Sequence, residues 1–122
     1  TVISQISEVK KGDSIGYSRK YKAEKDTRIA TIPVGYADGI PRLIGNKNGF
    51  VSIHKQKVPI VGNICMDMLM VDLENLPAKD GDKVIIFNEN PSLEEFSKYC
   101  KTIPYEVLTS ISRRVKRIYI KN

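Results

Sequence analysis

Short runs of apolar and β-branched residues, separated by polar or glycine-containing turns, recur along the chain up to Phe87. Runs bounded in this way are typical of β-strands. One more such run closes the chain. In the stretch at residues 58–61, Pro59 is expected to place the strand at an edge or a bulge of the sheet. The pattern predicts a mostly-β, barrel-like domain with about eight short strands. The predicted strands lie at residues 1–9, 14–23, 28–34, 50–53, 58–61, 66–73, 83–87 and 115–120.

Helical patterning is confined to the part of the chain between the last two predicted strands. Ser92 and Glu95 have the spacing of a capping box, in which each side chain bonds the backbone N–H of the other residue, so a helix is expected to about Tyr99. A second helical segment is expected at about residues 102–112, with Pro104 suited to an early helical position. The fold class is therefore mostly β with two short helices near the C-terminus.

The length and composition of the chain indicate a single globular domain. A chain of 122 residues is long enough for one core, and 41% hydrophobic with 28% charged residues opposes disorder. No apolar run is long enough to span a membrane, and no signal peptide is recognisable. The chain opens at Thr1 without a methionine, so we expect it to be a segment of a longer protein.

The net charge of +6 favours a solvated or anion-facing surface over a nucleic-acid-binding one. Aromatic residues make up only 7% of the chain, and the tyrosines fall in separate loops rather than along a basic face. Cys65 and Cys100 lack metal-site spacing, and His54 is the single histidine, so we expect no metal. Reduced thiols and a cytoplasmic location are expected. The basic cluster comprises Arg113, Arg114, Lys116 and Arg117.

Two loops at the ends of predicted strands present polar groups, which is where binding residues are often found. In the first, Tyr36, Asp38 and Arg42 form a polar turn. Asp38 either bonds its own backbone there or helps the others to guide a small charged ligand. In the second, Met66 stands between Cys65 and the next aspartate. Its side chain is expected to pack, whereas its backbone N–H is able to bind a carboxylate.

Two further tyrosines are candidates for chemistry. Tyr17 follows a glycine that allows close backbone approach, and it is either a partly buried structural residue or a phenol that transfers protons. A free phenol has a pKa near 10, so proton transfer needs a polarising partner, which this chain does not offer. Tyr105 stands at a predicted helix start, where its hydroxyl is able to meet an anion.

Taken together, these motifs resemble the C-terminal domain of alanine racemase, a pyridoxal-phosphate enzyme that interconverts L- and D-alanine. The resemblance covers nearly all of residues 1–122. It implies an N-terminal α/β barrel, absent from this chain, that holds the cofactor on a lysine, and a head-to-tail homodimer in which each site lies between one barrel and the other subunit's C-terminal domain. The matching segments are Gly16-Tyr17, Ile-Pro-Val-Gly-Tyr-Ala-Asp-Gly at 32–39, Val-Gly-Asn-Ile-Cys-Met-Asp at 61–67, Ile-Pro-Tyr-Glu-Val at 103–107 and Ile-Ser-Arg-Arg-Val at 111–115.

The resemblance also implies roles for individual residues. Tyr17 is the acid/base on the L face of the substrate, opposite the cofactor lysine, and a histidine and an arginine of the facing barrel are its partners. The Met66 backbone N–H lies near the substrate carboxylate, and the Tyr105 hydroxyl points at the cofactor phosphate. The substrate is a small amino acid, and the D-alanine made from it serves peptidoglycan synthesis. The residues implied to line a narrow access corridor are Tyr36, Arg42 and Asn63.

Two positions depart from the family pattern. The family often has arginine where this chain has Asn63, which removes one charge from the corridor. Ser18 stands where many members have glycine, and a serine is tolerated there when φ is negative. The chain alone is expected to be inactive. Alternatives are a serine racemase of the same family, including membrane-tethered resistance forms, a β-barrel module that binds nucleic acid or another anion, and a degenerate member used for assembly.

Overall fold

The computed structural model describes residues 1–15 and 21–120. Within these residues the chain is mostly β with two short helices, which confirms the predicted secondary-structure class. Two single-turn 3₁₀ helices, Tyr36–Asp38 and Arg42–Ile44, follow the fourth strand. In chain order the strands and α-helices are β1 Gln5–Val9, β2 Ser14–Ile15, β3 Tyr21–Lys22, β4 Thr27–Ile32, β5 Phe50–Ile53, β6 Gln56–Val61, β7 Leu69–Asp72, α1 Leu93–Tyr99 and α2 Pro104–Ser110.

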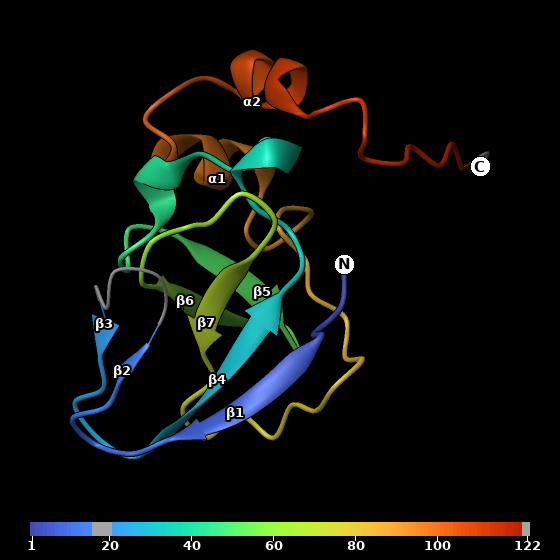
Figure 1. Ribbon diagram of the computed structural model, residues 1–122. Helices are drawn as coiled ribbons and strands as arrows, with labels where there is room; N and C mark the ends of the chain where they lie inside the picture. The colour runs from blue at the N-terminus through green and yellow to red at the C-terminus, as the bar shows by residue number, and fades with distance from the viewer. Residues whose placement is uncertain (16–20, 121–122) are drawn as a thin grey trace.

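Five strands form one antiparallel sheet in the order β1-β4-β7-β6-β5, and β2 pairs with β3 separately (Figure 1). His54 and Lys55 join β5 to β6 with φ values of 51° and 62°, the left-handed conformation that favoured two-residue hairpin loops require. In the β4–β7 pairing, Ile32 lies opposite Leu69, so β4 ends where β7 begins. The loop that leaves β4 and the loop that enters β7 therefore start from the same end of the sheet.

Aliphatic side chains from the central strands make the core. Ile32 of β4, Ile60 of β6 and Val71 of β7 have no exposed surface. Phe96 of α1 joins this cluster and packs on Phe87, with 5.3 Å between ring centroids. Figure 1 shows α1 and α2 together beyond the end of the sheet at which β4 ends. The loops at this end thus lie between the sheet and the helices.

The sheet is open rather than closed into a continuous barrel, which corrects the barrel-like expectation. The predicted strand at 83–87 is not a continuous strand either. It instead makes single bridges to two different partners, Val2 with Lys83 and Ser52 with Ile85. Its apolar pattern is explained by Val84, which is 1% exposed and belongs to the core. This segment therefore contacts Val2, which precedes β1, and the edge strand β5 at one residue each, and neither bridge extends into a ladder.

Three other predicted strands differ from those observed. The described ends of the 14–23 stretch are two strands, β2 and β3, that pair with each other. The 66–73 stretch is a strand only from Leu69 onward. The 115–120 stretch forms no strand, and Ile118, Tyr119 and Ile120 are 75%, 89% and 84% exposed because no described sheet edge lies beside them. Their apolar character therefore does not reflect pairing within this chain.

Pro59 occupies an inner strand of the sheet, not an edge. It lies opposite Phe50 of β5, and the pairing of β6 with β7 extends only over Ile60 and Val61. The ladder between β6 and β7 thus stops at the residue after the proline, which has no N–H to donate.

The helix starts agree with the sequence in part, because the Glu95 carboxylate does not complete the predicted capping box and instead accepts from the Tyr99 hydroxyl and pairs with Lys57. The Ser92 hydroxyl accepts a hydrogen bond from the Glu95 N–H at 3.1 Å, and α2 begins at Pro104.

Candidate functional site

Two loops at the helix end of the sheet are held together by backbone hydrogen bonds. The Tyr36 N–H donates to the Cys65 carbonyl and the Ala37 N–H donates to the Met66 carbonyl, both at 3.0 Å. Gly35 permits this contact, because a Cβ there would lie 2.2 Å from the Cys65 oxygen and 2.5 Å from the Met66 oxygen. We call residues 35–39 the tyrosine loop and residues 63–67 the methionine loop. The glycine is therefore required by close approach of two backbones.

A cavity of about 340 Å³ opens where these two loops meet. Tyr36 and Met66 on its wall are 44% and 53% exposed. The cavity brings together four residues that the sequence analysis assigned to the substrate path. Its lining residues are Tyr36, Arg42, Asn63, Ile64, Cys65 and Met66.

The cavity wall offers donors suited to an anion. The Arg42 side chain is exposed, and its guanidinium carries a permanent positive charge. Within the part of the chain that the structure describes, no hydrogen bond engages the Met66 N–H. A hydrogen bond orients the Asn63 side chain, because its Oδ1 accepts from the side-chain Nδ2 of Asn46 at 2.9 Å. The wall thus includes one cation, Arg42, and a residue, Met66, whose backbone N–H is not engaged by any described group.

The two remaining predicted site residues lie apart from the cavity wall or outside the description. Tyr105 is in the first turn of α2 and is 78% exposed, and it does not line the cavity. Among the described residues its hydroxyl has no hydrogen-bond partner. Tyr17 lies outside the described residues, as does Ser18. The assignment of Tyr17 therefore remains a prediction from sequence.

Arg114 is a residue whose importance the sequence analysis missed. Its Nε donates to Asp38 at 2.6 Å, and its second guanidinium nitrogen donates to Asp67 at 2.5 Å. This hydrogen bond from Arg114 is the main reason that the pKa of Asp38 falls below its usual value. Asp38 also accepts from the Gly35 N–H at 2.9 Å, which confirms the predicted bond to its own turn. The basic cluster was visible in the sequence, but its two acidic partners are far away along the chain.

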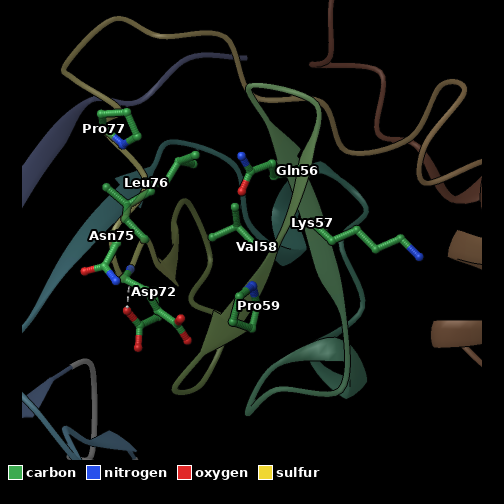
Figure 2. A pocket seen from close by; sticks show the side chains of 10 residues that line it. Gln56, Lys57, Val58, Pro59, Asp72, Asn75, Leu76 and Pro77 are labelled. Atoms are coloured by element: carbon green, nitrogen blue, oxygen red, sulfur yellow. Dashed lines mark hydrogen bonds between the residues drawn. The ribbon is translucent and has the colours of Figure 1, made fainter.

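A second cavity, of about 300 Å³, contains none of the predicted site residues (Figure 2). It lies between β6 and the segment after β7, where Asp72 is 7% exposed. The Thr27 and Tyr21 hydroxyls donate to this carboxylate at 2.5 and 3.0 Å, and burial with this contact raises the pKa of Tyr21 to about 12. In Figure 2 Lys57 points away from the other side chains, and it pairs with Glu95 at 2.7 Å. The Asp72 carboxylate is therefore already satisfied by the Thr27 and Tyr21 hydroxyls within the chain.

Comparison with known proteins identifies the family. The family described as "Alanine racemase, C-terminal domain" matches residues 1–119. The chain belongs to this family. An alanine racemase from Clostridium tetani is 43% identical over 127 residues, a match that covers all of this chain and 33% of that protein. The chain thus spans about a third of the length of the curated relatives it matches.

Solved structures of alanine racemases have the same fold. The enzyme from Bartonella henselae, described with covalently bound pyridoxal phosphate, has a TM-score of 0.92 and 40% identity, over 98% of this chain and 33% of that one. The enzyme from Clostridium difficile, described in complex with cycloserine, has a TM-score of 0.91 and 42% identity, over 100% of this chain and 32% of that one. The fold of this chain is thus that of an alanine racemase C-terminal domain.

Among residues 1–15 and 21–120, no group of three or more histidine, cysteine or acidic side chains is placed to bind a metal ion. None of the described helices combines the length and the apolar character that crossing a membrane requires.

Proposed function

We propose that this chain is the C-terminal domain of a pyridoxal-phosphate-dependent racemase that interconverts L- and D-alanine and supplies D-alanine for peptidoglycan. Membership of the family supports the assignment, and so does the fact that the chain accounts for about a third of each relative. An N-terminal α/β barrel precedes it in this proposal. Two subunits pair head to tail, and this domain completes the active site on the barrel of the other subunit.

The cavity between the tyrosine loop and the methionine loop is the observation that carries the proposal. Its volume of about 340 Å³ lies near the lower end for small-molecule sites, which suits a small amino acid. Arg42 and Asn63 line the access corridor with Tyr36, and the Met66 N–H binds the substrate carboxylate. Asparagine in place of the arginine that many members have leaves Arg42 as the cation of this wall.

Two donors of this chain fit pyridoxal phosphate and an amino acid, which between them carry a phosphate and a carboxylate. The exposed Tyr105 hydroxyl is available to the phosphate, and the Met66 N–H to the carboxylate. When bound, the cofactor supplies an electron sink that makes the α-proton of the amino acid acidic. The lysine that holds it and most of its contacts belong to the barrel, so the chain alone is inactive.

Tyr17 moves the proton on the L face in this proposal. Inversion at Cα needs one base on each face, because a proton removed from one side must be returned on the other. The phenol oxygen of Tyr17 takes the α-proton from L-alanine and returns it in the reverse direction. Since the ordinary pKa of a tyrosine is near 10, cationic groups of the facing barrel must stabilise its charged form.

The test is α-proton exchange in D₂O, followed by NMR, in the full-length protein that contains this chain with pyridoxal phosphate bound. Tyr17→Phe is compared with the unmodified protein, using L- and D-alanine separately. We expect exchange from L-alanine to collapse while some exchange from D-alanine survives through the lysine. Unaltered exchange of both enantiomers would show that Tyr17 is structural. If the unmodified protein exchanges neither, alanine is not the substrate, and serine is tested next.

A further inference from the structure

Arg114 joins three segments that are distant in sequence. It belongs to the stretch that follows α2, and its guanidinium contacts Asp38 at 2.6 Å and Asp67 at 2.5 Å. Asp38 closes the 3₁₀ helix that begins at Tyr36, and Asp67 directly follows Met66. A single cation thus contacts both loops that line the cavity, although it does not itself line the cavity.

Backbone contacts hold the same C-terminal stretch against the tyrosine loop. The Ser112 N–H donates to the Asp38 carbonyl at 3.1 Å. Gly39 has φ of 112°, and a Cβ there would lie 2.6 Å from the Ser110 oxygen. The C-terminal end of α2, the helix whose first turn carries Tyr105, is therefore fixed next to the loop that carries Tyr36.

Charge explains why an arginine is needed here. Asp38 and Asp67 come from separate loops, and without a shared cation their negative charges would repel each other across the contact. The planar guanidinium donates in two directions from a rigid frame, whereas a lysine ammonium is a compact point charge on a flexible stem. The side chains of Arg114 and Asp67 are 48% and 64% exposed, so the link is expected to bias the loop positions rather than to stabilise the whole fold.

We propose that Arg114 is a positioning residue that holds the tyrosine loop and the methionine loop in the relative placement at which the cavity binds the substrate carboxylate. The inference rests on the proposed function. Arg114 acts through Asp38 and Asp67 and does not touch the reacting atoms. Substrate contacts made through the Met66 N–H are the same before and during proton transfer, so their loss raises KM and spares kcat.

Steady-state racemisation by the full-length protein with pyridoxal phosphate provides the first test. For Arg114→Ala we expect KM for alanine to rise about tenfold with kcat changed less than about twofold. Arg114→Lys can keep one of the two contacts, so its KM for alanine should lie between those of the unmodified protein and Arg114→Ala. Arg113→Ala removes the neighbouring charge, which makes no ion pair within the described residues, and serves as the matched control. Loss of kcat at constant KM would indicate a merely structural role and overturn the proposal.

Hydrogen exchange provides a second readout that does not depend on the substrate. Peptides covering residues 35–39 and 63–67 should exchange faster in Arg114→Ala and not in Arg113→Ala, because only the first variant releases the two loops. Unchanged exchange in either loop overturns the proposal. If the unmodified protein fails to racemise alanine, the proposed function fails, and exchange alone then decides whether Arg114 positions the loops.

Discussion

Replacing Gly35 by alanine should separate the two loops that form the cavity. The new Cβ would lie 2.2 Å from the Cys65 oxygen and 2.5 Å from the Met66 oxygen, so one backbone must move by about 1 Å to reach ordinary contact. A shift of that size breaks the bonds from the Tyr36 and Ala37 N–H groups, each now 3.0 Å long.

The expected cost follows from these contacts. Overpacking of a close contact costs about 1–3 kcal/mol, and each lost backbone hydrogen bond adds about 1 kcal/mol. A local loss of at least about 3 kcal/mol is therefore expected, which corresponds to about 150-fold faster exchange when exchange follows the local opening equilibrium. Hydrogen-exchange mass spectrometry of the full-length protein, on peptides covering residues 35–39, measures this directly.

Gly12→Ala is the matched control for this experiment. Gly12 has φ of 90°, and a Cβ there meets nothing within 4 Å, so the substitution strains the backbone without pushing two segments apart. It should leave exchange at residues 35–39 unchanged. If Gly35→Ala alters that exchange by less than about threefold, the close approach of the two loops is not what holds them, and the reasoning is refuted.

Two further predictions concern titratable groups. Because Arg114 lowers the pKa of Asp38, the ionised carboxylate stabilises the fold above the ordinary aspartate pKa, and this contribution is lost as pH falls through the lower folded value. Asp38→Asn should therefore lower the thermal unfolding midpoint at neutral pH, and this decrease should become smaller in acid. A decrease that becomes larger in acid would contradict the ion pair. Burial raises the pKa of the Cys100 thiol to about 11, so iodoacetamide at pH 8 should modify Cys65 first and Cys100 only after unfolding, as peptide mapping will show.

Local sequence signals predicted the elements that depend on local physics. The N-cap at Ser92 and the proline at residue 104 mark the starts of α1 and α2, because caps are satisfied by residues a few positions away. The 83–87 and 115–120 stretches have strand-like composition but form no strand. Whether such a stretch forms a strand depends on how far it runs beside another strand in the fold, which composition does not encode.

The site was predicted only in part, because local motifs indicate its residues but not the contacts between segments that are distant in sequence. Motifs indicated Tyr36, Arg42, Asn63 and Met66, and the structure places all four on one cavity wall because β4 ends beside the start of β7. The link through Arg114 was not predicted. Its partners lie 76 and 47 residues away, and nothing in the pattern of the basic cluster distinguishes it from its neighbours.

The central claim is that this domain completes an alanine racemase site on the other subunit, and mixed dimers test it most directly. Full-length Tyr17→Phe subunits are coexpressed with subunits in which the lysine that would hold the cofactor is replaced by alanine. Each variant alone should be inactive. If the site is shared between subunits, about half of the dimers are hybrids with one intact site, so the mixture should recover about a quarter of the unmodified alanine racemase activity. A mixture that forms hybrid dimers and yet shows no activity would place both groups in the same subunit and contradict the account.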